Sequence, residues 1–108
     1  MKLRFRWGAM ILLLLALPVL AQAESLPGNE WEGRKLAREV CSACHSVEKA
    51  ELGVSPVGAP AFQDIADDPA VTETALLVFF RMPHEGMPDL ILTPAETDDA
   101  IAYILGLR

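Results

Sequence analysis

The chain has 108 residues, of which 9 are Lys or Arg and 15 are Asp or Glu, and its formal net charge at pH 7 is −6. This length predicts a single domain, and the acidic balance argues against nucleic acid or an anionic membrane surface as a partner. The chain has two cysteines, so at most one disulfide can form.

The N-terminus has the pattern of a secretory signal peptide. Three basic residues come first, residues 7–20 are almost wholly apolar, and Ala21-Gln22-Ala23 matches a signal-peptidase site. The apolar stretch is too short to cross a bilayer comfortably, although an uncleaved anchor remains the alternative. We therefore predict that residues 1–23 are a signal peptide, that the protein is exported to the periplasm, and that it is not stably inserted in the membrane after cleavage.

Cleavage after Ala23 leaves one domain of 85 residues, 24–108, with 6 basic and 15 acidic residues and a net charge of −9. A domain this small has a marginal core and often depends on a cofactor, a metal or a disulfide. The charge favours a basic surface on any protein partner.

The first predicted helix begins at Asn29, a good N-cap residue, and extends to about Cys44. The small residues Gly33 and Ala37 lie four apart on its apolar face, where another helix can approach closely. Glycine and proline breaks after His45 predict a long loop over 46–60, followed by a short turn of helix over 62–66.

A second helix is predicted to begin at Asp68-Pro69, with proline at the first helical position, and to run to about Arg81. Thr72 is an alternative N-cap. Residues 75–80 are apolar on every side, which predicts that they are buried on more than one face.

Two prolines and a glycine prevent a regular helix over residues 82–92. The last helix is predicted from Thr93 to about Gly106, because Thr93 and Glu96 form a capping box with proline at the first helical position. Its predicted apolar face comprises Ala100, Ile101, Ile104 and Leu105. The predicted fold class is therefore all-α, with three main helices and long loops.

Cys41-Ser42-Ala43-Cys44-His45 is the segment that carries chemistry. C-x-x-C-H is the attachment motif of c-type haem. Two thiols three residues apart on one helical turn point the same way and can add to the two vinyl groups at one porphyrin edge. The imidazole of His45 then reaches the iron, so the predicted cofactor is one covalently bound haem c.

Other uses of the two thiols remain open at this point. A thioredoxin-type redox pair needs a βαβ setting, which the predicted elements do not provide. A zinc site needs further ligands, for which only His84 and a carboxylate remain. A plain disulfide is compatible with export.

Three residues of the second half are candidates for the sixth iron ligand. Met87 lies in a loop between two helices, from which its side chain can be aimed at the distal face of a haem. Met82 ends a helix and is expected in the core. His84 is expected to be solvated, with bis-histidine ligation as the alternative. The soft ligands Met82-x-His84-x-x-Met87 also allow a copper-binding protein.

These segments together resemble the small class I (monohaem) bacterial cytochromes c, over essentially all of residues 24–108. The resemblance rests on Cys41-x-x-Cys44-His45, Gly58-Ala59-Pro60, Phe80-Arg81-Met82-Pro83-His84-Glu85-Gly86-Met87-Pro88, Glu96 and Ala102-Tyr103-Ile104. It implies a cytochrome c-like fold of helices and loops wrapped around one haem.

The resemblance also implies roles for individual residues. The histidine of the motif is the proximal iron ligand in that family, which implies His45, and the methionine of the M-P dipeptide is the distal ligand, which implies Met87. A proline in the central loop accepts a hydrogen bond from the ligand imidazole, which implies Pro60. The terminal helices cross at small residues, with Gly33 and Ala37 against Ile101 and Ile104. Trp31 and Tyr103 are expected to pack in the core at this crossing, with a place near a haem edge as the alternative.

The implied function is periplasmic electron transfer rather than enzymatic turnover, because a six-coordinate iron has no vacant site for oxygen or peroxide. The expected partners are redox proteins with a basic docking surface. The protein itself is expected to be a monomer or a subunit of a complex. A cytochrome subunit bound to a periplasmic dehydrogenase or oxidase is the alternative. If Met87 does not bind the iron, a peroxidase is a further alternative.

Overall fold

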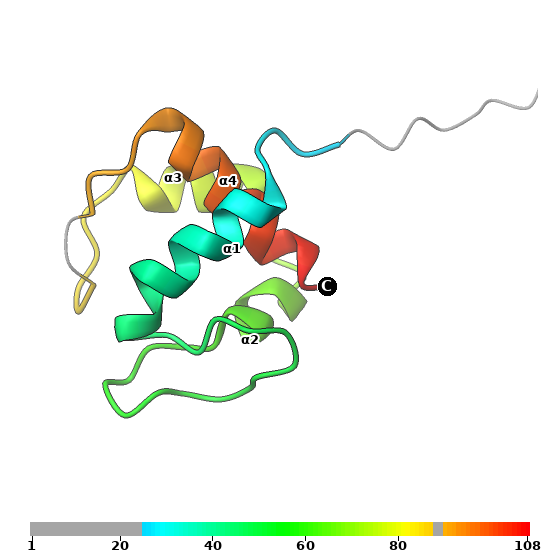
Figure 1. The fold of residues 1–108 in the computed structure, drawn as a ribbon. Helices are drawn as coiled ribbons and strands as arrows, with labels where there is room; N and C mark the ends of the chain where they lie inside the picture. The colour runs from blue at the N-terminus through cyan, green and yellow to red at the C-terminus, as the bar shows by residue number, and fades with distance from the viewer. Residues whose placement is uncertain (1–24, 88–89) are drawn as a thin grey trace, which may run out of the picture.

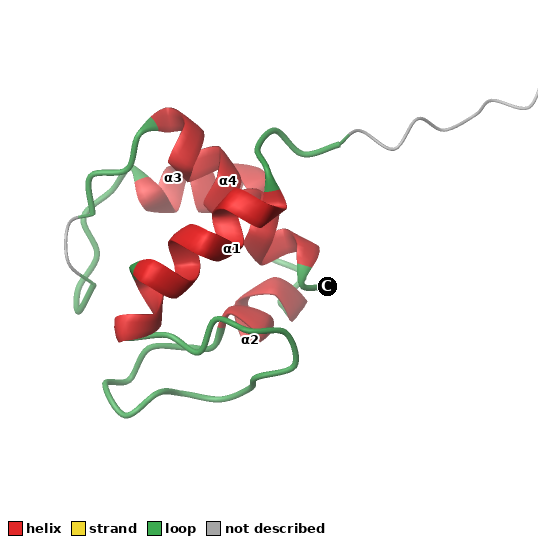
Figure 2. Cartoon of the chain, viewed as in Figure 1, coloured by secondary structure: helices red, strands yellow, loops and turns green. Residues whose placement is uncertain are grey.

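The computed structural model describes residues 25–87 and 90–108, so the predicted signal peptide and Pro88 lie outside the described residues. Its elements are α1 (Glu30–Glu39), the 3-10 turn η1 (Cys41–Ala43), α2 (Phe62–Asp67), α3 (Glu73–Phe80) and α4 (Pro94–Gly106). The described residues contain helices, loops and two isolated β-bridges but no strand, as Figure 2 shows. The all-α class is confirmed, and the short turn predicted after residue 60 is a fourth helix. None of the described helices is long and apolar enough to cross a membrane.

Helix α4 is the centre of the fold, since it contacts α1, α2 and α3 (Figure 1). Its crossing with α1 is close because α1 has no side chain at Gly33. A Cβ atom there would lie 1.9 Å from the backbone oxygen of Asp99 and 2.8 Å from the Cβ of Tyr103. Ala37 belongs to the same buried cluster as Ile101. The predicted crossing at two small residues is therefore found, with Asp99 and Tyr103 nearest to Gly33.

Gly33→Ala is expected to destabilise the domain by about 1–3 kcal/mol, because the added methyl group overlaps the backbone of α4 and the helices must separate. In urea unfolding, the variant should have a lower midpoint concentration of urea and an unchanged slope of the free energy of unfolding against urea concentration. Lys35→Ala is the matched control, since Lys35 is exposed on the same helix and should change stability by less than about 0.5 kcal/mol. Equal midpoints for the two variants would contradict the close crossing.

Side-chain caps fix where α1 and α4 begin. The side-chain Oδ1 of Asn29 accepts a hydrogen bond from the Trp31 N–H (2.9 Å). Thr93 Oγ1 accepts from the Glu96 N–H (3.2 Å), and Glu96 Oε2 accepts from the Thr93 N–H (2.8 Å). Both predicted caps are confirmed. The bonds from Thr93 lower the pKa of Glu96, so this carboxylate stabilises α4 fully at neutral pH and progressively less as acid protonates it.

Helix α1 ends earlier than predicted. It stops at Glu39 instead of continuing to about Cys44, and Val40 is its C-cap. The chain then tightens into a 3-10 turn in which the Cys44 N–H donates to the Cys41 carbonyl (3.0 Å). A 3-10 turn preserves nearly the same apolar spacing as an α-helix, so the periodicity of the sequence did not reveal the change.

Helix α3 begins later than predicted, after Thr72 instead of Asp68. The Asp68 carboxylate accepts a hydrogen bond from the Ala70 N–H (2.8 Å), which closes a local turn. Thr72 Oγ1 accepts from the Ala75 N–H (3.1 Å) and is the N-cap. Asp68 therefore stabilises the turn before the helix, and the alternative cap was the correct one.

Burial was overestimated for several apolar residues. In α3 only Leu76 is buried, whereas Val78 is 50% and Phe79 41% exposed. Met82, expected in the core, is 58% exposed, and Trp31 is 69% exposed. Leu76 and Phe79 line a large cavity, which explains why the apolar surface of α3 is not covered by other residues of the chain.

The predicted core face of α4 is confirmed. Ala100, Ile101, Ile104 and Leu105 are all buried. Tyr103 is also buried, and it packs in the same cluster as Phe62 and Leu76. The core therefore lies between α4 and the helices that surround it, directly behind the cavity.

Candidate functional site

The cavity has a volume of about 480 Å³, within the range of roughly 300–1,000 Å³ that is common for cofactor sites. Residues from η1, the loop before α2, helices α2 to α4 and the segment after α3 surround it. Apolar side chains dominate its walls, among them Val57, Phe62, Leu76, Phe79, Phe80 and Ile104. Its size and lining are suited to a large, flat, mainly apolar group.

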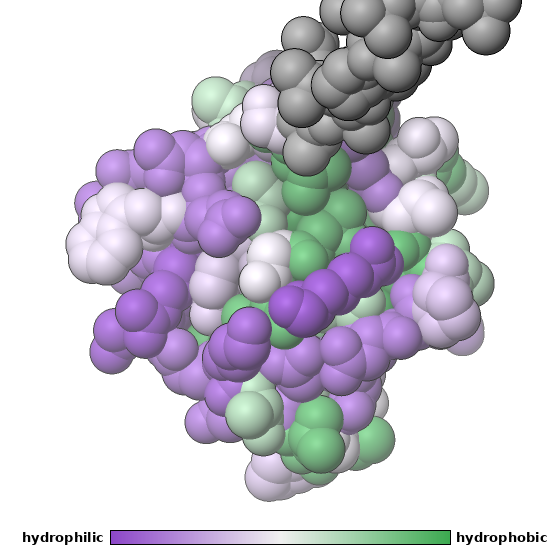
Figure 3. All heavy atoms as spheres, turned by 90° about the vertical axis from the view of Figure 1, so that its right-hand side faces the viewer, coloured by the Kyte–Doolittle hydropathy of each residue, from purple (hydrophilic) through white to green (hydrophobic). Residues whose placement is uncertain are grey.

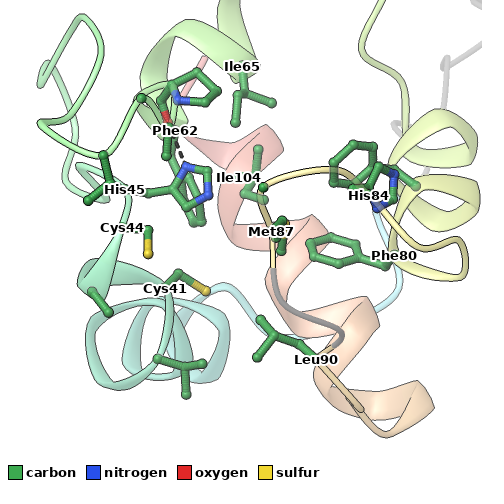
Figure 4. A pocket seen from close by; sticks show the side chains of 18 of the residues that line it. Cys41, Cys44, His45, Phe62, Ile65, Phe80, His84, Met87, Leu90 and Ile104 are labelled. Atoms are coloured by element: carbon green, nitrogen blue, oxygen red, sulfur yellow. Dashed lines mark hydrogen bonds between the residues drawn. The ribbon is translucent and has the colours of Figure 1, made fainter.

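Both thiols of the C-x-x-C-H motif line this cavity. Turn η1 carries Cys41, and Cys44 follows directly after it; both cysteines are free and partly buried. Burial raises the pKa of Cys41, so this side chain is held as the protonated thiol at neutral pH. Figure 4 shows both sulfur atoms on the same side of the pocket as the ring of His45. The two thiols and the imidazole therefore form one wall.

The imidazole of His45 is held by a hydrogen bond to the loop before α2. Its Nδ1 lies 2.7 Å from the carbonyl oxygen of Pro60, drawn as a dashed line in Figure 4. Because a carbonyl only accepts, Nδ1 carries the proton, and Nε2 has a free electron pair. Nε2 is therefore the atom of this ring that can bind a metal.

The opposite wall includes both Met87 and His84. The two residues form an isolated antiparallel bridge across the Glu85-Gly86 turn, where Gly86 has a φ of 78°. Directly paired residues of such a bridge project from the same face. The ring of His84 stacks on Phe79, with ring centroids 3.4 Å apart. In the view of Figure 4, Met87 stands between His45 and His84.

The residues of this site fit a covalently attached haem. One wall offers two free thiols and an imidazole nitrogen, the other offers a thioether, and the space between them is mainly apolar. The structure gives no support to the zinc alternative, since among residues 25–87 and 90–108 no three His, Cys, Asp or Glu side chains are arranged so that they could hold a metal ion. The βαβ setting of a thioredoxin-type pair is also absent from this part of the chain.

Several contacts secure the loop between His45 and α2. The Phe62 N–H donates to the Ser46 carbonyl (2.9 Å) and the Ala50 N–H to the side chain of Gln63 (2.9 Å). Ala50 has a φ of 64°, a left-handed conformation that costs a residue with a side chain roughly 1–2 kcal/mol. The Tyr103 hydroxyl donates to the Val47 carbonyl (2.6 Å). These bonds hold the carbonyl of Pro60 in place against the imidazole.

Sequence reasoning missed Phe62 as a residue of the site. Its ring centroid lies 5.2 Å from that of His45, and it is 5% exposed. The available signal was a single aromatic residue two positions after Pro60, at the end of a glycine- and proline-rich loop. Such a signal does not distinguish a core residue from one that contacts a ligand.

Comparison with known proteins gives one match. The sequence model of the family described as Cytochrome c matches residues 31–108. No curated protein and no solved structure matches the chain at a significant level. The matched region includes all of α1 except its first residue, the whole of α2 to α4, and a single C-x-x-C pair, Cys41 and Cys44.

Proposed function

We propose, from the premise that this chain belongs to the cytochrome c family, that it is an exported electron carrier whose single haem iron is bound by His45 and Met87. The family and the single C-x-x-C-H motif give the chain one covalently bound haem c. The observation that carries the ligand proposal is the apolar cavity with His45 on one wall and Met87 on the other. Members of this family are typically electron carriers and not enzymes.

Each residue of the site has a separate role in this proposal. When bound, the haem supplies a one-electron ferric/ferrous couple. The Cys41 and Cys44 thiols would each add across a vinyl group: the S–H bond and the π bond of the vinyl group break, and a C–S and a C–H bond form, without net oxidation. His45 donates through Nε2, and the carbonyl of Pro60 keeps the proton on Nδ1 and strengthens that donor. Met87 donates through sulfur, and His/Met ligation raises the potential.

The surface near the cavity suggests how a partner docks. Val57 and Phe79 line the cavity and are 67% and 41% exposed, and among the described residues that line it Glu85 alone has a formal charge. The face on the side of the C-terminus is largely hydrophilic, with apolar residues in a central band and in a separate patch at its lower edge (Figure 3). We propose that apolar contact at the cavity brings the partner close, while the net charge of −9 on residues 24–108 attracts a basic partner from a distance.

The rate of electron transfer to a positively charged redox protein is expected to fall with salt. Raising the ionic strength from about 0.01 M to about 1 M shortens the Debye length from roughly 30 Å to roughly 3 Å, and the bimolecular rate should fall by about tenfold or more. Stopped-flow mixing of the reduced holoprotein with the oxidised partner measures it. An acidic redox protein is the control, because its rate should rise with salt. Equal salt dependence for both partners would contradict long-range attraction.

A tightly bound subunit of a periplasmic dehydrogenase or oxidase is the second candidate. The observation that favours it is the set of exposed apolar residues in the loop before α2, where Leu52, Val54 and Val57 are 67–70% exposed. Monomeric proteins seldom expose large apolar patches without a partner. Sedimentation of the purified holoprotein separates the candidates, since a free carrier remains monomeric at high concentration.

The experiment that tests the proposed function is expression with the native N-terminus in a host that matures c-type haem. Ferric and ferrous spectra and an acid extraction under denaturing conditions are then recorded. A c-type ferrous spectrum, haem that stays with the protein, and the weak far-red ferric band of sulfur ligation would support the proposal. Haem without that band would remove Met87 as the ligand. A colourless protein beside a working control cytochrome would overturn the proposal.

A further inference from the structure

The imidazole of His45 makes two different contacts with the same short segment. Its Nδ1 bonds to the carbonyl of Pro60, 2.7 Å away. Its ring packs on that of Phe62, with centroids 5.2 Å apart and planes inclined at 53°. The hydrogen bond locates one corner of the imidazole, but it leaves the ring free to tilt about that corner. The contact with Phe62 is what limits this tilt.

Phe62 is itself held from two sides. Its backbone N–H donates to the carbonyl of Ser46 (2.9 Å), the residue that follows His45. Its ring packs against that of Tyr103, with centroids 6.5 Å apart and planes inclined at 57°. The Tyr103 hydroxyl donates to the carbonyl of Val47 (2.6 Å). Phe62 is 5% and Tyr103 7% exposed, so both rings are packed inside the protein, with Phe62 between Tyr103 and the cavity.

We propose that Phe62 is a positioning residue that sets the plane of the His45 imidazole above the haem, and that Tyr103 fixes Phe62 in that position. The inference rests on the proposed function, since it takes His45 as an iron ligand. Residues that contact a metal ligand control its orientation and donor strength. In a ferric low-spin haem the unpaired electron is distributed according to the plane of the axial imidazole. The position of Phe62 should therefore be visible in the magnetic spectra of the iron.

The test uses the ferric holoprotein with Phe62→Leu, which keeps an apolar side chain but removes the ring plane. The measurements are the g-values by electron paramagnetic resonance, the paramagnetically shifted proton signals of the haem methyl groups, and the midpoint potential. Ile101→Val is the matched control, because Ile101 is 2% exposed in the same core and does not line the cavity. We expect altered g-values, a changed order or spacing of the methyl signals and a shifted potential in Phe62→Leu, and wild-type values in Ile101→Val.

Tyr103→Phe provides an independent variant if Phe62→Leu does not mature. It keeps the ring and removes the hydroxyl with its hydrogen bond to Val47, so we expect the same spectral changes with smaller amplitude. Wild-type g-values and methyl shifts in a haem-loaded Phe62→Leu or Tyr103→Phe would overturn the inference and leave the proposed function intact. Changes of equal size in Ile101→Val would also overturn it, because they would reflect general loosening of the core. A wild-type chain without a histidine-bound haem would overturn the proposed function as well.

Discussion

Replacement of His45 by Ala is expected to abolish the folded, haem-loaded domain. The change removes the proposed proximal ligand, the hydrogen bond to Pro60 and the ring contact with Phe62 at once. Loss of one residue that merely supports a metal ligand costs about 10–100-fold in metal affinity or activity, so loss of the ligand should reduce the yield of holoprotein by more than about tenfold. The haem absorbance per mole of protein measures the loss of haem, and the far-ultraviolet circular dichroism measures the loss of helical structure.

A small domain is especially sensitive to this change. Only a marginal core is available to a chain of this size, and here that core borders a cavity of about 480 Å³. His84→Ala is the control, because it removes a histidine from the opposite wall and should leave folding and haem content unchanged. A helical, haem-loaded His45→Ala protein with wild-type stability would show that another residue is the proximal ligand.

Met87→Ala should give the second largest effect, after His45→Ala. It should change the midpoint potential and the ligand binding of the haem iron, and not the folding of the domain. The thioether links at Cys41 and Cys44 remain, so covalent haem is retained. Loss of the sulfur donor should lower the midpoint potential by on the order of 0.1 V, a modest part of the roughly 0.8 V that axial ligands span. The reduced variant should also bind carbon monoxide, which the wild-type protein should exclude. Potentiometric titration and flash photolysis of the carbon monoxide complex measure these changes.

Met82→Ala is the matched control for this prediction. Met82 lies in the same segment but is 58% exposed and does not line the cavity. Its replacement should therefore leave the midpoint potential unchanged, and the reduced iron should still not bind carbon monoxide. If Met87→Ala retains the wild-type potential and excludes carbon monoxide, Met87 has no role as a ligand. The same measurements on His84→Ala would then show whether His84 binds the iron instead.

Local signals in the sequence were sufficient to predict where the first and last helices, α1 and α4, begin. Asn29 and Thr93 cap their helices through hydrogen bonds to backbone groups two or three residues away, so nothing distant in the chain is needed to predict them. The start of α3 was different, since Asp68 and Thr72 are both competent caps. Only the folded chain determines that the Asp68 carboxylate closes a turn and leaves the helix start to Thr72.

Burial was harder to predict, because an apolar pattern does not indicate what covers it. The sequence of α3 correctly indicated an apolar helix, yet Phe79 faces a cavity and remains 41% exposed in the protein alone. The motif identified Cys41 and His45 because their spacing is itself the requirement for attachment. No such rule joins Phe62 to Tyr103, which are brought together only by the packing of α2 on α4.

The close contact of Gly33 with Asp99 has a consequence for the order of folding. It joins parts of the chain that are more than 60 residues apart, and closing so long a loop costs entropy before any packing is gained. Of the four described helices, α4 is also the last to be synthesised. A chain interrupted before α4 therefore lacks the partner of every other helix and should remain unfolded even with its cofactor attached. The native domain should accordingly form only once α4 is present, and partial chains should be rapidly degraded by proteases.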